Sequence, residues 1–120
     1  EADAIIIGTP VFQASIPATL KNVFDLLPEK AFLNKVVSML VTAGSSKHYL
    51  IVEQQLKPIL SYMKAQIVQG YVFIEEKDFL MKEIINDDVL FRLDRLVEDT
   101  IVLTETYKKI REAKEAEYGF

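Results

Sequence analysis

The chain has 120 residues, a formal net charge of -4 and no cysteine. This length allows one domain with a hydrophobic core, and the lack of cysteine excludes disulfides, thiolate metal sites and cysteine nucleophiles. Basic residues are mixed with acidic ones, no apolar run approaches the roughly 20 residues that cross a bilayer, and His48 is the single histidine, so we expect no nucleic-acid partner, no membrane span and no metal site.

The first elements are a strand, a stiff loop and a helix. Residues 4–8 form a continuous apolar run, which predicts a strand covered on both faces. A polar loop with two prolines follows, and apolar residues then recur at helical spacing over residues 18–27. We expect Ser15 to cap this helix, Pro17 to lie in its first turn and Pro28 to end it.

Two further strand and helix patterns follow. Residues 35–41 are a second apolar run of strand length, and a loop of small residues follows at 42–46. Residues 48–64 have helical spacing, with Pro58 expected to kink the helix or split it in two. Residues 66–75 alternate weakly and predict a third strand.

The last third of the chain is charged. Residues 76–88 predict a surface connection, with some helix at most, and Asp87 or Asp88 can cap a long final helix that runs to about residue 116. The apolar face of that helix is expected to consist of Val89, Leu93, Leu96, Val97, Thr100, Ile101 and Tyr107.

Regular alternation of strands and helices predicts an α/β fold, with a parallel sheet and covering helices. Three strands make a narrow sheet, and residues 4–8 follow only three residues of chain. One edge of the sheet would then be an exposed apolar strand. We therefore expect an upstream segment or another chain to cover that edge.

The loops at residues 9–15 and 42–48 follow two consecutive parallel strands, so both are expected at the same edge of the sheet, where open α/β sheets bind ligands. They contain hydroxyls, backbone amides, Phe12, Gln13, Lys47 and His48. This set suits a flat heteroaromatic ligand with a polar edge, and the absence of a carboxylate argues against acid–base hydrolysis. Two plainer interpretations stay open: Phe12 could cover the rim of the core, and His48 could merely begin a helix.

Several motifs, taken together, resemble one family. They are Thr9-Pro10-Val11-Phe12, Ser15-Ile16-Pro17, Leu20-Lys21-Asn22, Thr42-Ala43-Gly44-Ser45 and Leu56-Lys57-Pro58-Ile59-Leu60. Over residues 2–73 the chain resembles the NAD(P)H-dependent FMN reductases, a flavodoxin-like family, and within it the alkanesulfonate-system branch. Phe12 stands where the family often has Tyr, and Gln54 where sulfonate-system enzymes tend to carry an extra Tyr.

The resemblance implies a flavodoxin-like, three-layer α/β/α fold with a parallel sheet. The chain would be a single partial domain, with a motif-bearing core at residues 1–75 and a connection and C-terminal helix at 76–120. Nothing in the chain corresponds to the family's N-terminal strand, its phosphate loop and the next unit, so the chain resembles the later two-thirds of such a domain.

The resemblance also implies a function: an NAD(P)H-dependent FMN reductase that transfers hydride from nicotinamide to N5 of FMN, with no catalytic side chain. Backbone amides of the first loop would meet the N5 edge of the ring, and the second loop its pyrimidine end. The implied cofactor-binding residues are Thr9, Pro10, Val11, Phe12, Gln13, Ser15, Ile16, Thr42, Ala43, Gly44, Ser45 and His48.

Partners follow from the same resemblance. We expect a cytoplasmic homodimer or homotetramer, since apolar side chains such as Tyr49, Val52 and Leu56 exceed what a three-stranded sheet can cover, and a flavin-accepting monooxygenase as a further partner. Two alternatives stay open: a flavodoxin-like FMN-binding electron carrier, and an inactive fragment that acts as an interaction module. The absence of Trp, and a single aromatic side chain in the loops, favour the reductase over the carrier.

Overall fold

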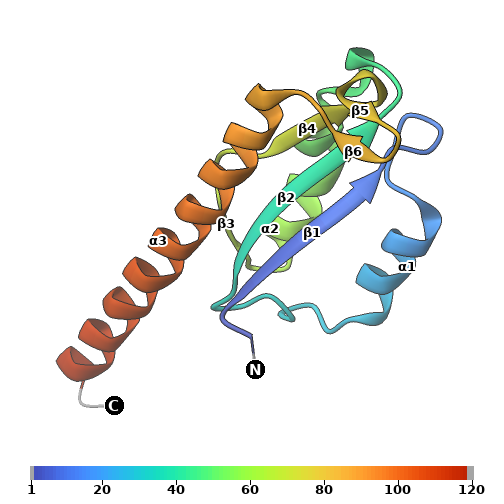
Figure 1. The fold of residues 1–120 in the computed structure, drawn as a ribbon. Helices are drawn as coiled ribbons and strands as arrows, with labels where there is room; N and C mark the ends of the chain where they lie inside the picture. Colours follow the sequence, from blue (N-terminus) through green and yellow to red (C-terminus); the bar gives the residue numbers. More distant parts are fainter. Residues whose placement is uncertain (1, 119–120) are drawn as a thin grey trace.

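A parallel sheet lies at the centre of the protein, with strand β2 in its middle (Figure 1). The structure, a computed structural model, describes residues 2–118. Strand β1 (Ala4–Pro10) runs along one edge of β2 (Val36–Ala43). Two short strands, β3 (Gln66–Ile67) and β4 (Val72–Glu75), share the other edge. All these pairings are parallel, as the alternation of elements predicted.

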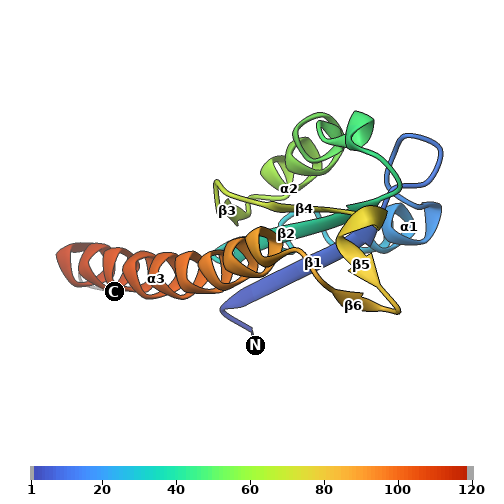
Figure 2. The same ribbon diagram turned by 45° about the horizontal axis from the view of Figure 1, so that its top comes forward.

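Helices cover both faces of the sheet (Figure 2). Helix α1 (Ala18–Leu26) and helix α2 (Lys57–Tyr62) pack on one face, where Phe24 and Leu60 join a core with Met39 and Phe73. Helix α3 (Asp87–Tyr118) packs on the other face through Val89 and Leu96, among other residues. The predicted three-layer α/β/α arrangement is therefore confirmed.

The burial of the strands explains their sequences. In β2, Val37, Met39 and Val41 are fully buried on the α1–α2 face, and Val36 is buried on the α3 face. A strand covered on both faces gains from apolar residues at every position. Strand β1 pairs with β2 alone, and its Ile6 is 53% exposed on the α3 side.

The expected cap of α1 is wrong. Pro17, not Ser15, is the N-cap residue, and its carbonyl accepts hydrogen bonds from the backbone N–H groups of Leu20 and Lys21 at 3.1 Å. Ser15 lies two residues too early to reach the free N–H groups of the first turn. Its hydroxyl donates instead to Gln55 Oε1 at 3.3 Å.

The single helix expected over residues 48–64 is only partly correct. A 3-10 turn (η1, Ser46–His48) and a bend come first, and the helical run then begins at Ile51 with a π-helical turn (η2, Val52–Leu56). The N–H of Lys57 donates to the carbonyl of Val52, five residues earlier. This wider turn brings the chain to Pro58, which lacks an N–H, in the first turn of α2, so the run continues to Tyr62 without a split.

The third predicted strand is interrupted. Its residues form β3 and β4, which follow the same edge of β2 with residues 68–71 between them. Val68 still donates its N–H to the Val37 carbonyl at 2.9 Å, but Gly70 is exposed and adds no side chain to the sheet.

The predicted charged connection forms a small hairpin. A 3-10 turn (η3, Glu76–Asp78) leads into β5 (Phe79–Leu80), which pairs antiparallel with β6 (Glu83–Ile84). Asn86, rather than Asp87 or Asp88, caps α3, because its Oδ1 accepts the Asp88 N–H at 3.0 Å.

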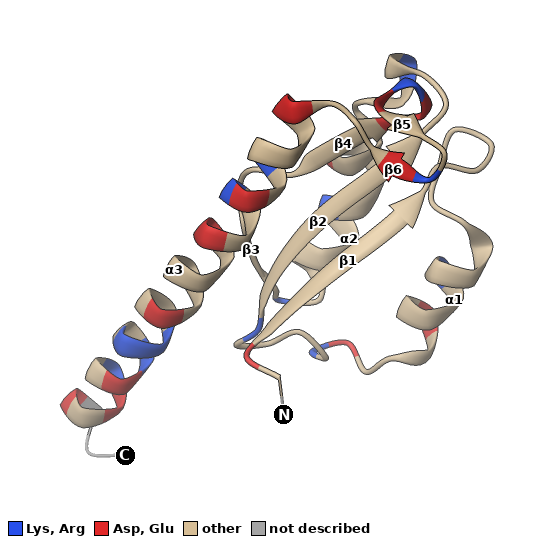
Figure 3. Ribbon diagram, viewed as in Figure 1, with Lys and Arg blue, Asp and Glu red and all other residues tan. Residues whose placement is uncertain are grey.

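The outer surface carries the charges. Figure 3 shows Lys, Arg, Asp and Glu residues along α3 and around the hairpin, whereas the central strands are almost free of them. On α3, Val97 and Ile101 are 49% and 53% exposed, so these two do not belong to its buried face as predicted. None of the helices within residues 2–118 is both long and apolar enough to cross a membrane.

Candidate functional site

The two predicted loops meet at the carboxyl ends of β1 and β2. Pro10 lies opposite Thr42 at the last position of the pairing, and the N–H of Val11 donates to the Thr42 carbonyl at 3.1 Å. This bond extends the contact between the strands into the loops. Residues more than 30 positions apart therefore form one edge, as the parallel topology predicted.

The first loop is a tight turn closed by two hydrogen bonds. Phe12 N–H donates to the Ser15 carbonyl at 2.9 Å, and Ser15 N–H donates to the Phe12 carbonyl at 3.0 Å. Gln13 and Ala14 have φ angles of 49° and 59°, in the left-handed region that costs free energy for residues other than glycine. The turn leaves the Phe12 side chain 60% exposed.

A first pocket lies between this turn and the helices of one face. It has a volume of about 540 Å³. Four predicted site residues line it, together with residues of α1, η2 and α2: Phe12, Gln13, Ser15, Ile16, Ala18, Lys21, Gln55 and Ile59. We refer to it as the turn pocket.

A second pocket lies where both loops meet the hairpin. It has a volume of about 300 Å³ and is lined by Pro10, Val11, Thr42, Ala43, Gly44, Glu76 and Phe79. We refer to it as the edge pocket. The sequence predicted a single cleft, whereas the structure divides nine of its residues between the two pockets, because the turn at 12–15 stands between them.

Three predicted site residues line neither pocket. Thr9 is only 4% exposed, and its hydroxyl donates to the Pro10 carbonyl at 2.9 Å. His48 is half-buried in η1. Ser45 precedes η1, and its Oγ is buried without a hydrogen-bond partner among the described residues.

Sequence reasoning missed the contribution of the hairpin. A Cβ placed on Gly44 would lie 4.0 Å from Glu76 Oε2, so this carboxylate lies close to the second loop. Neither loop contains a carboxylate, but the edge pocket receives one from η3. The signal was present: Glu76 follows the third predicted strand, and a third parallel strand must end at the same edge as the first two.

An aromatic cluster begins directly after the second loop in the chain. The ring of Tyr49, directly after η1, lies 5.7 Å from the Tyr71 ring and 5.4 Å from the Phe73 ring. Lys57 Nζ lies 5.2 Å above the Tyr71 ring and also pairs with Glu53 at 2.9 Å. Burial, with the nearby Tyr49 hydroxyl and Glu53 carboxylate, raises the pKa of Tyr71 to about 12.

Comparison with known proteins places this chain in a family. The profile of the family described as NADPH-dependent FMN reductase matches residues 1–79. An NAD(P)H-dependent FAD/FMN reductase of Geobacillus thermodenitrificans is 39% identical over 83% of the chain and 55% of its own length. An FMN reductase (NADPH) of Escherichia coli is 42% identical over 67% of the chain and 42% of its own length. The chain thus spans about half the length of these relatives.

A solved structure shares the fold as well as the sequence. An oxidoreductase from Corynebacterium diphtheriae superposes with a TM-score of 0.78 and 32% identity, over 88% of this chain and 57% of that one. The flavodoxin-like fold that the sequence predicted is confirmed. Because the family profile matches well over half of the chain, including both loops and the start of the hairpin, the chain belongs to the NADPH-dependent FMN reductase family.

Proposed function

We propose that this chain supplies the ring-binding walls of an NAD(P)H-dependent FMN reductase. The observation that carries the proposal is the hydrogen bond between Val11 N–H and the Thr42 carbonyl, which joins the two family loops beside the exposed Phe12 ring. The names of the relatives support the activity and its two cofactors, FMN and NAD(P)H. The nicotinamide used stays open in this proposal.

The residues present fit a flat ring with a polar edge. Phe12 offers an exposed aromatic side chain, and the tip of its turn presents the backbone N–H groups of Gln13 and Ala14, which take part in no hydrogen bond recorded among the described residues. Ser45 Oγ is buried and lacks a partner there too. Amides and hydroxyls of this kind can donate to ring nitrogens and carbonyls.

The proposed cofactor-binding residues are the twelve that the family motifs indicate: Thr9, Pro10, Val11, Phe12, Gln13, Ser15, Ile16, Thr42, Ala43, Gly44, Ser45 and His48. Bound FMN would supply the hydride-accepting chemistry. This chain's own residues would orient the ring through Phe12 and the backbone of both loops and would shield one side of it from water. Thr9 would act by keeping the base of the first loop packed, since its side chain is buried.

The proposal includes a homodimer or homotetramer. A groove of about 560 Å³ lies between α1 and α2, with Phe24, Leu27, Ile59 and Met63 among its lining residues. Tyr62, which also lines this groove, is 65% exposed, and Leu26 of α1 is 78% exposed. The sequence predicted the oligomer from apolar surface of Tyr49, Val52 and Leu56 that the sheet could not cover. This reason is wrong for Val52 and Leu56, which are fully buried in the core, whereas Tyr49 is half exposed.

Two further parts of the proposal concern the cell. A flavin-accepting monooxygenase would consume the reduced flavin that an FMN reductase produces. A cytoplasmic location is compatible with a chain that contains no cysteine.

The test is oxidation of NADH and of NADPH at 340 nm with FMN present, for this chain and for the complete product of its gene. We expect FMN-dependent oxidation by the complete product. Flavin binding without nicotinamide oxidation would instead indicate an electron carrier. Absence of both flavin binding and turnover in the two proteins would overturn the proposal and favour an interaction module.

A further inference from the structure

One wall of the edge pocket is formed by residues outside the central sheet. Glu76 and Phe79 line this pocket opposite Thr42 and Gly44, and they belong to η3 and the start of β5. Strand β5 pairs only with β6, over two residues on each strand. A two-stranded ribbon this short is not stable alone in water, so other contacts must fix the position of this wall.

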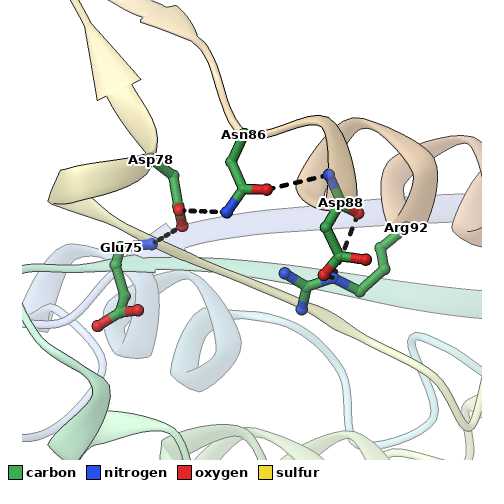
Figure 4. A network of polar contacts seen from close by, with 5 residues as sticks. All are labelled: Glu75, Asp78, Asn86, Asp88 and Arg92. Atoms are coloured by element: carbon green, nitrogen blue, oxygen red, sulfur yellow. Dashed lines mark hydrogen bonds and ion pairs between the residues drawn. The ribbon is translucent and has the colours of Figure 1, made fainter.

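A buried carboxylate makes these contacts. Asp78, between Glu76 and Phe79, is 5% exposed. One of its carboxylate oxygens accepts the Glu75 N–H at 2.9 Å, and the other accepts the side-chain amide of Asn86 at 2.8 Å (Figure 4). The Asp78 carbonyl also accepts the Ile85 N–H at 2.8 Å. Hydrogen bonds to an ionised group are stronger than those between neutral groups.

Asn86 connects this carboxylate to a helix that is fixed in the core. Its amide nitrogen donates to Asp78, and its amide oxygen accepts the Asp88 N–H at the start of α3. Val89, one residue further, is fully buried in the same core cluster as Ile74 of β4. The hairpin wall is thereby joined both to the end of β4 and to α3.

We propose that Asp78 and Asn86 are positioning residues, which hold the wall formed by Glu76 and Phe79 against the second loop and so set the affinity of the site for a flavin ring. The inference rests on the proposed function and goes beyond it, since neither residue lines either pocket. When a supporting residue is changed and a wall shifts by about 1 Å, the site binds more weakly even though its own residues are intact.

The exchange of an amide for a carboxylate separates the two roles of Asn86. In an Asn86→Asp variant, the new carboxylate can still cap α3 by accepting the Asp88 N–H. It cannot donate to Asp78, and two carboxylates then face each other at hydrogen-bond distance. We expect the affinity for riboflavin, which carries the ring but no phosphate, to fall on the order of tenfold at pH 7.

A second variant restores the hydrogen bonds with reversed polarity. In the double variant Asp78→Asn/Asn86→Asp, the new amide at 78 accepts the Glu75 N–H and donates to the carboxylate at 86, which still caps α3. We expect its affinity for riboflavin to return to within about twofold of the unaltered chain. Asn22→Asp, an equal charge change on the exposed side of α1, is the control and should leave the affinity unchanged.

The pH dependence gives an independent measurement. The charges that act on the Asp78 carboxyl are those of Lys77 and Arg92, and these two side chains also pair with Glu75 at 3.4 Å and with Asp88 at 3.3 Å, respectively. In the single variant, the facing carboxylates raise the pKa of their shared proton site, and a protonated carboxyl can donate as the amide did. Affinity for riboflavin should therefore recover as the pH falls from about 7 to 5, a recovery that the unaltered chain lacks.

The experiment is a titration of riboflavin fluorescence with each protein, with far-ultraviolet circular dichroism to confirm folding. If the unaltered chain binds riboflavin and the single variant binds it equally well, the inference is overturned and the proposed function is not. The same holds if the double variant fails to restore the affinity that the single variant loses. No binding by the unaltered chain would overturn this inference for the chain, and absence of flavin binding in the complete gene product as well would overturn the proposed ring site. If the single variant does not fold, the affinity of the double variant decides.

Discussion

Phe12 is the residue whose side chain the site can lose at the least cost to the fold. The Phe12 side chain is 60% exposed, so its removal takes little buried apolar surface away from the fold. We expect Phe12→Ala to weaken riboflavin binding about fivefold, because stacking on an aromatic ring contributes about 1 kcal/mol, and to leave the melting temperature almost unchanged.

Leu80 provides the control for Phe12, because the side chains of the two residues are equally exposed. Leu80 is also 60% exposed and lies in the hairpin, outside both pockets, so Leu80→Ala should change neither affinity nor stability. Phe12→Tyr should bind riboflavin as the unaltered chain does. Equal affinities for all four proteins, measured by fluorescence titration, would show that Phe12 only covers the rim of the core.

Asp78 makes stability depend on pH in the acid range. Its hydrogen bonds to Asn86 and to the Glu75 N–H hold the pKa of its carboxyl below the value of about 3.8 of an isolated aspartate. A lowered pKa in the folded state stabilises the protein above the ordinary value, and this stabilisation is lost as the pH falls through the folded-state pKa.

Asp78→Asn should therefore lower the urea midpoint at pH 7, and the difference from the unaltered chain should shrink below about pH 4. Urea unfolding followed by circular dichroism between pH 2 and 7 measures this difference. A difference that stays constant over the whole range would show that the charge of Asp78 contributes nothing.

At the scale of the elements, α3 combines a long part that contacts the rest of the protein with a short exposed end. Tyr107 donates its hydroxyl to Asn34 Oδ1 at 2.8 Å, and Arg111 donates to the Asn34 carbonyl at 3.4 Å. Residues 112–117 beyond them are exposed. The helix is thus held by its first 25 residues.

Deletion of residues 112–120 should shift the thermal midpoint by less than about 2 °C, because the side chains of residues 112–117 are exposed. Leu96→Ala, which empties a position that is 4% exposed, should destabilise the protein by about 2–4 kcal/mol. Thermal and urea unfolding of both variants measure the two effects. A large loss of stability on deletion would show that the outer turns of α3 have a partner.

The elements that the sequence predicted well are those with long apolar patterns. β2 needs apolar residues on both faces, and an apolar run of this length that ends at a loop of small residues is typical of such a strand. The hairpin was missed because β5 and β6 have two residues each, too few for any periodicity. The cap of α3 was misplaced because Asn86, Asp87 and Asp88 are all good capping residues, and only the backbone decides between them.

The same reasoning limits what the sequence reveals of the site. Two loops could be placed at one edge because each follows a clear strand. Glu76 was overlooked because its segment was interpreted as a solvated connection, and the separation of the two pockets depends on the left-handed conformations at Gln13 and Ala14, which have no signature in the sequence. The division of the chain at about residue 75 stays a prediction.

At the scale of the whole molecule, exposed apolar side chains on α1 and α2 lead to an oligomer prediction. Leu26 is 78% exposed, so Leu26→Glu should leave the fold intact and shift a dimer towards monomer. Sedimentation equilibrium at micromolar concentration measures the change, and Leu80→Glu on the hairpin is the matched control. An unaltered chain that sediments as a monomer would contradict the proposed dimer.

The central position of β2 also governs how the chain can fold. β2 pairs with β1, β3 and β4, and no two of these three pair with each other. Each pairing closes a loop of roughly 30 residues, so the chain loses conformational entropy before any strand contact forms. The smallest unit whose contacts can offset this entropy loss consists of β2, one neighbouring strand and the helix that connects them. We expect formation of this nucleus to be the rate-limiting step of folding.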